Sequence, residues 1–301
     1  MGNAEFHRKL RESLHRARQL WIKDPHLEAD QIIDLLPAGF MKVIGGETTC
    51  VEVKSGESQL ILDMGTGARK LGYDMMARNR FGDVHILLTH THWDHIQGWP
   101  FFVPGYIPTN HVHFYSGHMN CEERMIRQQH FDHFPLTWAE MRSTRDFNIF
   151  HPGDSFEIGP FKIRTFLLTH PGESIAYRIE AEGKVFIFST DTEFFGTDLA
   201  DQIQRADSFF RAADMLLMDA QYTVDESSQK IGWGHTAMDI AVDCASAWGV
   251  KHLVLTHHEP AHEDDRILSM FSDTLKHYEE IRKDRPRMNI NLAFESDTYR
   301  L

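Results

Sequence analysis

The sequence predicts an α/β fold in which two β-sheets pack face to face and helices cover both outer surfaces, a four-layer αββα sandwich. Three observations predict it. Apolar, β-rich segments come in two groups, one before residue 90 and one after residue 160. Helical patterns lie between and after the two groups. Four of the apolar segments are followed directly by a His or an Asp, which indicates that polar groups gather along one edge of the sheets.

The first two elements are expected to be helices. Apolar residues recur at helical spacing through residues 4–22, at Phe6, Leu10, Leu14, Ala17 and Trp21. This pattern predicts one amphipathic helix. A second, shorter helix is expected over residues 26–36, because Pro37-Ala38-Gly39 would end it.

The remaining elements are strands and helices in alternation. The apolar, β-rich segments predict strands at about residues 48–54, 58–63, 84–89, 160–168, 174–181, 184–190, 215–218, 252–256 and 288–294. Helices are expected at about residues 67–79, 197–211, 264–283 and from Thr236 onward. Residues 119–147 are mixed in character and rich in His, Phe and Met, so a helical insertion is expected there.

The length and composition allow a full hydrophobic core. At 301 residues and 42% hydrophobic, the chain can form one large domain or two modest ones. No apolar run approaches the roughly 20 residues that span a bilayer, and the first residues lack the apolar stretch of a secretory signal. The cysteines are far apart and odd in number, so no disulfide framework is expected and a reducing cytoplasm is the expected location.

The charge of the chain is strongly acidic. Its formal net charge is −13, from 44 acidic and 31 basic residues. Such a chain repels nucleic-acid polymers unless it carries a basic patch, and its basic stretches are short and mixed with acids. Bound metal ions would lower the effective negative charge near a site. The balance favours a small anionic substrate that is attracted by cations.

The densest chemical motif is His90-Thr91-His92-Trp93-Asp94-His95, which follows an apolar strand. His90 and His92 are two residues apart, so they point the same way, and a short helical turn is expected at Asp94 and His95. Two imidazoles can hold one cation while the Asp and the last His hold a neighbouring one. Such donors suit zinc, iron or manganese. A set of surface histidines is the alternative, and the buried strand before the motif disfavours it.

Two cations need about eight donor atoms, so residues elsewhere in the chain must complete the motif. Three further side chains that bind metals follow directly after an apolar strand: His170, Asp191 and His257. One such histidine can simply cap its strand by bonding the backbone. Three of the same form indicate an assembled site along one sheet edge.

The order HxHxDH, a later His, a later Asp and a final His resembles the metallo-β-lactamase superfamily of metallo-hydrolases. The likeness runs from about Gly45 to about Asp265 and includes the run Leu62-Asp63-Met64-Gly65-Thr66-Gly67. The resemblance implies the four-layer fold and a site with two divalent metal ions. By this resemblance one metal ion would be bound by His90, His92 and His170, the other by Asp94, His95 and His257, and both by a bridging Asp191.

The resemblance also divides the chain. Residues 40–301 form the expected hydrolase domain, which contains the helical insertion over residues 119–147. Residues 1–39 match nothing in the core that the family shares. We therefore expect an N-terminal helical extension that serves as a lid or joins two copies into a homodimer.

Gly234-His235-Thr236 indicates a branch of the family. It looks like the Gly-His-Ser element of tRNase Z and of phosphoribosyl cyclic phosphodiesterases, whose His binds no metal but stabilises or protonates the oxygen at phosphorus. The alternative is that His235 merely precedes a helix. Asp219 lies where tRNase Z has His-Glu-Ala-Thr, and it would either orient His235 or bond local backbone. Close relatives often have His where this chain has Met218.

The nearest likeness within the superfamily is to a bacterial group of phosphodiesterase-like hydrolases, on residues 92–102 and 257–264. In the second run, His258 and His262 would either contact substrate or be surface or helix-start residues, and the second alternative is expected. Aromatic and histidine side chains that follow the metal motif would either form a wall for a nucleobase or pack in the core, in the loop from Trp99 to Pro108 and at His118, His130, Phe131, His133 and Phe134.

The leading expectation is a cytoplasmic hydrolase with two metal ions, zinc or else manganese or iron, that cleaves a small phosphodiester such as a cyclic nucleotide. A hydroxide held by the metal ions would attack phosphorus in line, with Asp94 steering it and His235 assisting the leaving group. A tRNase Z-like endoribonuclease is an alternative that the acidic charge disfavours. A non-catalytic diiron oxygen sensor is another, but diiron members usually carry Glu in place of the second His, so His92 disfavours it.

Overall fold

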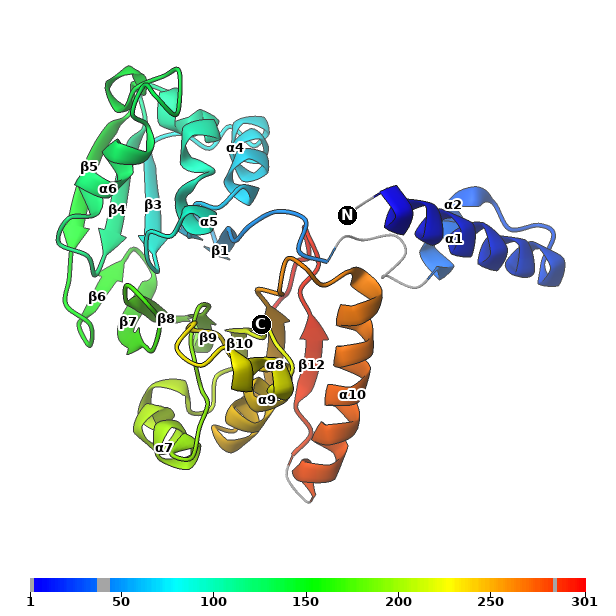
Figure 1. Cartoon of the computed structure of the whole chain (residues 1–301). Coiled ribbons are helices and arrows are strands. Elements are labelled where there is room, and N and C mark those ends of the chain that lie inside the picture. The colour runs from blue at the N-terminus through cyan, green and yellow to red at the C-terminus, as the bar shows by residue number, and fades with distance from the viewer. Residues whose placement is uncertain (1–2, 37–43, 284–285) are drawn as a thin grey trace.

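The computed structural model describes residues 3–36, 44–283 and 286–301, and it has the predicted four layers, with two sheets between layers of helices (Figure 1). The predicted helix stop at Pro37-Ala38-Gly39 and the boundary between residues 39 and 40 lie outside the described residues. Within those residues, no helix combines the length and the apolar character needed to cross a membrane.

The first sheet carries the His90–His95 motif directly after its central strand. Its strands, in spatial order, are β1 (Val51–Ser55), β2 (Ser58–Leu62), β3 (Asp83–Leu88), β4 (His111–Ser116) and β5 (Thr144–Ile149). β1 and β2 form an antiparallel hairpin, and the strands from β2 to β5 are parallel. Because parallel strands end at the same edge of a sheet, the loops that follow β2 and β3 meet there.

The second sheet supplies the other three predicted metal ligands. Its strands, in spatial order, are β12 (Asn289–Leu292), β11 (His252–Thr256), β10 (Met215–Asp219), β9 (Lys184–Ser189), β8 (Ser174–Ala181), β7 (Phe161–Leu168) and β6 (Ser155–Ile158). Neighbours from β6 to β9 are antiparallel, whereas β9 to β12 are parallel. β7, β9 and β11 therefore all end near the same edge.

Helices cover the outer faces of both sheets. The first sheet is covered by α4 (Gly67–Ala77), α5 (Trp93–Ile96) and α6 (Cys121–Gln128), and the second by α7 (Leu199–Phe210), α9 (Met238–Ala247) and α10 (Asp264–Arg282). Shorter elements lie in the loops: α8 (Val224–Gln229) and the 3-10 turns η1 (Trp99–Phe101), η2 (Val103–Tyr106) and η3 (Trp138–Glu140).

Each space between two layers holds its own buried apolar cluster. In β9, Ile187 packs against the outer helices, whereas Phe186 and Phe188 pack between the two sheets. In β3, Ile86 and Leu87 likewise belong to different clusters. Successive side chains of a strand point to opposite faces, so a continuous apolar strand is one that is covered on both sides. The rigid sheets then hold the loops at their edge in fixed positions.

The N-terminal extension consists of α1 (Asn3–Lys23) and α2 (Ala29–Leu35), which project away from the two-sheet body in Figure 1. Lys9 forms a buried ion pair with Asp264 at the start of α10, and Arg8 contacts Asp265 at 2.7 Å. The Trp21 indole donates a hydrogen bond to the carbonyl oxygen of Leu27 at 2.8 Å, which ties the two helices together. Both predicted N-terminal helices are confirmed.

The predicted helical insertion over residues 119–147 is wrong in part. Only α6 and η3 are helical there, and residues 144–147 belong to β5, a strand at the edge of the first sheet. The sequence of β5, Thr-Arg-Asp-Phe-Asn-Ile, has no buried residue, because an edge strand is covered less than a central one. It therefore lacks the apolar run that marks a strand in a sequence. β4 and β6 were missed for the same lack of a continuous apolar run.

Candidate metal centre

Three strand ends turn sharply where the candidate site lies. Asp63, Asp191 and His257 each follow a strand closely and have positive φ angles of 60°, 54° and 59°. Asp and His tolerate this left-handed conformation better than bulkier or β-branched residues do. Such backbone conformations cost of order 1–3 kcal/mol and cluster at functional sites. The chain turns out of each strand at the edge where the motif residues gather.

Two glycines let the loops after β2 and β3 touch. A Cβ atom on Gly98 would lie 1.8 Å from the carbonyl oxygen of Gly65, and one on Gly65 would lie 2.4 Å from that of Asp94. The loops are joined by backbone hydrogen bonds, from Met64 to His95 at 2.7 Å and from Gly98 to Met64 at 2.8 Å. The Gly residues are needed because only a residue without a Cβ fits this close approach.

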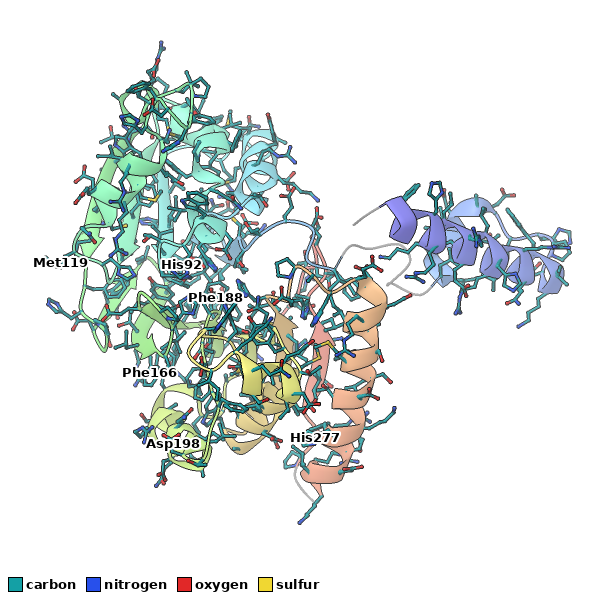
Figure 2. The ribbon with its side chains drawn as sticks, in the orientation of Figure 1. His92, Met119, Phe166, Phe188, Asp198 and His277 are labelled. Carbon is teal, nitrogen blue, oxygen red and sulfur yellow. The ribbon has the colours of Figure 1, made fainter. Side chains whose placement is uncertain are left out.

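The first donor group joins the two sheets and consists of His90, His92, His170 and Asp191, whose ligand atoms all lie within 4.8 Å of one another. His170 Nε2 lies 3.1 Å from His92 Nδ1. Asp191 Oδ2 lies 3.5 Å from His90 Nε2 and 3.7 Å from His170 Nε2. Figure 2 labels His92 at the lower end of the first sheet, on the side of the second sheet.

The second donor group lies beside the first and uses the other oxygen of Asp191. Asp191 Oδ1 lies 3.2 Å from His95 Nε2 and 3.2 Å from His257 Nε2. Asp94 Oδ2 lies 3.2 Å from each of the same two nitrogens. All seven predicted ligands are therefore brought together, with Asp191 between the two groups.

The spacing of these atoms fits bound metal ions. Four ligands about 2.0–2.1 Å from one zinc ion lie about 3.3–3.4 Å apart at the corners of a tetrahedron. The buried Nε2 atoms of His90 and His95 make no hydrogen bond within the described chain. Buried polar atoms are rarely left without a partner, so a cation at each group would satisfy them. Imidazole nitrogens and carboxylate oxygens are the donors that zinc, manganese and iron accept.

Electrostatics keep two of the donors, His90 and Asp191, in the protonation states that bind cations. Burial lowers the pKa of His90 well below its usual range, with His95 adding to the effect, so His90 is neutral. Burial alone would raise the pKa of Asp191, but His257 and His95 outweigh it and lower that pKa well below its usual range. A neutral imidazole and an ionised carboxylate both offer a lone pair to a metal ion.

Asp63 supports one histidine of each donor group through hydrogen bonds, to His95 directly and to His90 through Thr89. Its carboxylate is fully buried, and its Oδ2 accepts a hydrogen bond from His95 Nδ1 at 2.8 Å. Its oxygens also accept from Thr89 Oγ1 at 2.9 and 3.1 Å, and Thr89 Oγ1 in turn lies 3.0 Å from His90 Nδ1. Hydrogen bonds of this kind fix the tautomer of each histidine and leave Nε2 free for a metal ion.

Replacing Asp63 with asparagine is expected to weaken the binding of divalent metal about 10- to 100-fold, because the neutral amide supports the histidines less well. Competition with a chelator of known affinity measures the change. Asp74→Asn, on the exposed side of α4, is the matched control and should leave affinity unchanged. Equal affinity in Asp63→Asn and the parent protein would show that Asp63 does not support the ligands.

His235 and Asp219 form a pair next to the two donor groups. His235 Nδ1 lies 2.7 Å from Oδ2 of the fully buried Asp219. The His235 ring stacks on His257 with centroids 5.1 Å apart and meets the edge of His170 at 5.2 Å. Asp219 also accepts hydrogen bonds from the backbone of Gln221 and Thr236 at 3.2 and 3.3 Å. Both alternatives for Asp219, orienting His235 and bonding the local backbone, are therefore observed together.

Glu193 fixes the loop that carries His235, a role that no motif in the sequence predicts. Its carboxylate accepts hydrogen bonds from the backbone of Gly232 and of Gly234, at distances of 2.8 to 3.0 Å. The carbonyl oxygen of Gly234 then lies 3.0 Å from His170 Nδ1. Glu193 thus connects the loop to a predicted metal ligand. The position of Glu193 two residues after Asp191 is a weak sequence signal, since surface loops often contain glutamate.

The remaining histidines and aromatics divide into packed and exposed residues. His258 is held near the carbonyl oxygen of Ala220 at 3.4 Å, and its burial lowers its pKa to about 4. His262 Nε2 contacts Glu226 at 3.0 Å. Trp99 is fully buried in the core of the first sheet, so it cannot form a wall for a substrate. Trp93, inside the motif, is 77% exposed.

Comparisons with known proteins agree with this geometry. Residues 64–258 match the beta-lactamase superfamily domain. Ribonuclease Z of Lactococcus lactis subsp. lactis (strain IL1403) is 26% identical over 222 residues, which cover 57% of this chain and 69% of that protein.

Solved structures show the same fold. The metallo-beta-lactamase fold protein YhfI from Bacillus subtilis superposes with a TM-score of 0.60 at 19% identity, over 82% of this chain and 89% of that one. The short form of human tRNase Z superposes with a TM-score of 0.55 at 18% identity, over 71% and 86% of the two chains. Because the family match spans more than half of the chain and includes every predicted metal ligand, this protein belongs to the beta-lactamase superfamily, as the resemblance implied.

Proposed function

We propose that this protein is a two-metal hydrolase that cleaves a small phosphodiester, such as a cyclic nucleotide. The observation that carries the proposal is the pairing of His235 with Asp219 at 2.7 Å beside the two donor groups. A hydrolase of another ester class has less need of this histidine. Displacement at phosphorus builds charge on the equatorial oxygens and on the leaving oxygen, where a positioned cationic donor acts.

The roles of the residues follow from their contacts. Zinc, manganese or iron ions, when bound, would supply Lewis acidity and lower the pKa of a coordinated water. His90, His92 and His170 would hold one ion, Asp94, His95 and His257 the other, and Asp191 both. Asp94 uses Oδ2 toward His95 and His257, so its other oxygen is available to accept a hydrogen bond from the nucleophile.

His235 would act at the phosphate through its second nitrogen. Its Nδ1 is engaged with Asp219, which leaves Nε2 to donate a proton or a hydrogen bond to the leaving oxygen. The buried carboxylate of Asp219 stabilises positive charge on the ring during this step. Glu193 holds the adjoining loop, so the ring is oriented before the substrate binds.

Two further features support a small anionic substrate that contains a nucleobase. Arg124 donates to Thr91 Oγ1 at 2.9 Å, which places a positive charge beside the motif. Trp93 exposes an aromatic face next to the ligands, and aromatic faces stack on any nucleobase. The net charge of −13 disfavours a long polyanion.

The second candidate is a tRNase Z-like endoribonuclease. It is supported by the 26% identity to the Lactococcus ribonuclease Z over 222 residues. Such an enzyme must hold a polyanion far larger than the donor groups, and that contact would show a steep loss of affinity with salt.

A substrate comparison tests the proposal. The purified protein, loaded with zinc or manganese, is assayed on bis-(p-nitrophenyl) phosphate, on 2′,3′- and 3′,5′-cyclic nucleotides and on a precursor tRNA. We expect hydrolysis of the first two classes at the same site and no cleavage of the tRNA. Cleavage of the tRNA at its 3′ end would support the second candidate, and inactivity on all phosphodiesters would overturn both.

The proposal includes the cellular location and the oligomeric state of the enzyme. We place it in the cytoplasm, consistent with the free thiols of Cys50, Cys121 and Cys244. The exposed Phe6, Leu10 and Leu14 side chains of α1 support a homodimer formed through the N-terminal extension. Sedimentation of the full chain, with its mass compared with 34.9 kDa, checks that association.

A further inference from the structure

A second cluster of histidines and carboxylates lies at the other end of the first sheet, where its parallel strands begin. It comprises Asp83 and His85 of β3, His111 and His113 of β4, and Asp146 of β5. In the sheet, Asp83 pairs with His111, and His113 pairs with both His85 and Asp146. Paired residues, and residues two apart along a strand, point to the same face of a sheet, so all five project to one side.

This cluster is separate from the candidate metal centre. His85 lies five residues before His90 along an extended strand. At about 3.3 Å per residue, the two positions are about 17 Å apart. The upper end of the first sheet in Figure 1, where β3 to β5 begin, is accordingly opposite the end at which His92 is labelled in Figure 2. No ion can be shared between the two groups of residues.

Asp146 contacts both histidines of β4. Its Oδ2 lies 2.9 Å from His113 Nδ1 and 2.6 Å from His111 Nε2. The other nitrogen of His113, Nε2, lies 3.2 Å from Asp83 Oδ1. Asp83, His111 and His113 each present a ligand atom within 4.8 Å of the other two. A carboxylate on one ring nitrogen of a histidine, as Asp146 provides for His113, is the usual support for a metal ion on the other.

The Nε2 atom of His111 provides an independent indication of a cation. This atom is buried, although the side chain as a whole is 40% exposed, and it makes no hydrogen bond within the described chain; Asp146 Oδ2 is 2.6 Å away. The contact lacks hydrogen-bond geometry, so the ring proton does not point at the carboxylate. The lone pair of an unprotonated Nε2 leaves the ring in the same direction as that proton would, so it is not directed at Asp146 either and is available to a cation. A cation bound there would give this buried atom the partner that it lacks.

We propose that Asp83, His111 and His113, supported by Asp146, bind one divalent transition-metal ion of the zinc class. Two imidazoles and a carboxylate are donors that zinc prefers. The Asp83 side chain is 69% exposed, so the ion enters from solvent and water completes its coordination. His85 stacks on His113 with centroids 4.8 Å apart and an interplanar angle of 17°, which holds the His113 ring in place.

The bound ion would act as a structural clamp. It links β3 and β4, and through Asp146 it reaches β5 at the edge of the sheet. An ion that binds only the folded chain stabilises that chain, and more so as its concentration rises. The melting temperature of the protein should therefore increase with zinc even when the candidate metal centre is disabled.

Metal counting tests this site independently of the proposed function. The full chain and its His111→Gln/His113→Gln variant are dialysed against buffered free zinc, and bound zinc is measured by mass spectrometry. We expect the variant to bind one zinc ion fewer per chain. The same difference of one should appear when both proteins also carry Asp191→Ala, which disables the candidate metal centre. A His151→Gln variant, whose altered side chain is 85% exposed, is the control and should bind as much zinc as the parent.

Two results would overturn the proposal of a zinc site at Asp83, His111 and His113. One is an equal zinc content in the parent protein and in His111→Gln/His113→Gln. The other is a zinc-dependent rise in melting temperature that survives in that variant on the Asp191→Ala background. If the double variant does not fold, Asp83→Asn at the exposed rim replaces it in both measurements, with the same one-ion loss expected. Failure of the phosphodiesterase assays would leave these counts unaffected.

Discussion

Replacing Asp191 with alanine is expected to remove both metal ions and to reduce phosphodiester hydrolysis by about 10³-fold or more. Asp191 places one oxygen toward each donor group, so its loss takes a ligand from both. The histidines around it lie close together, and His90 and His95 are buried, so without the carboxylate they would repel one another once protonated. Loss of metal catalysis removes several kcal/mol of transition-state stabilisation, and each 1.36 kcal/mol is about tenfold in rate.

Metal analysis and steady-state kinetics on the same preparation check this expectation. Asp201→Ala, which changes an exposed carboxylate on α7, is the matched control and should keep full metal content and activity. Circular dichroism shows whether the variant remains folded. A folded Asp191→Ala protein that retains two metal ions per chain would contradict the role given to Asp191.

Replacing His235 with alanine is expected to lower kcat about 10²- to 10⁴-fold while both metal ions stay bound. The ring contacts His257 and His170 only by stacking and edge packing, so its removal takes no ligand away. A general acid matters most when the leaving group is poor. The loss should therefore be large for a cyclic nucleotide and small for bis-(p-nitrophenyl) phosphate, whose leaving group needs no proton.

The loss of kcat on cyclic nucleotides, compared with the loss on bis-(p-nitrophenyl) phosphate, separates a catalytic role of His235 from a structural one. Asp219→Asn keeps the shape of the side chain but removes its charge. Its kcat should also fall more on cyclic nucleotides than on bis-(p-nitrophenyl) phosphate, but by a smaller factor than in His235→Ala. His151→Ala, which changes an exposed histidine outside the candidate metal centre, is the control. A His235→Ala protein with full kcat on cyclic nucleotides would refute the assigned role, and an equal loss on both substrates would indicate a structural role instead.

The convergence of the seven candidate metal ligands could be predicted because each carries a local signal. Asp191 and His257 follow apolar strands that are buried on both faces, and His170 follows a strand that is buried on one face. These three strands run in the same direction, so their ends lie at one edge. The supporting residues carry no such signal. Asp63 and Glu193 are single acids in loops, and their partners are backbone groups and ring nitrogens from distant parts of the chain.

The missed strands and the distal histidines have a common physical reason. β4 alternates polar and apolar residues because only one of its faces is fully covered where His111 and His113 lie. β5 is an edge strand with a polar sequence, so a helical insertion was expected in its place. The cluster of Asp83, His113 and Asp146 exists only through the register of three strands, which no spacing along the chain reveals.

The position of the metal ions themselves is the most direct test of the central claim, that side chains from both sheets converge on two cations. Crystals of the zinc-loaded protein are measured at the zinc absorption edge. Besides the peak expected at Asp83, His111 and His113, two anomalous peaks are expected at the candidate metal centre, one among His90, His92 and His170 and one among Asp94, His95 and His257, with Asp191 touching both. A single peak or none at the candidate metal centre would contradict the claim, as would coordinates in which His170, Asp191 or His257 turn away from the other ligands.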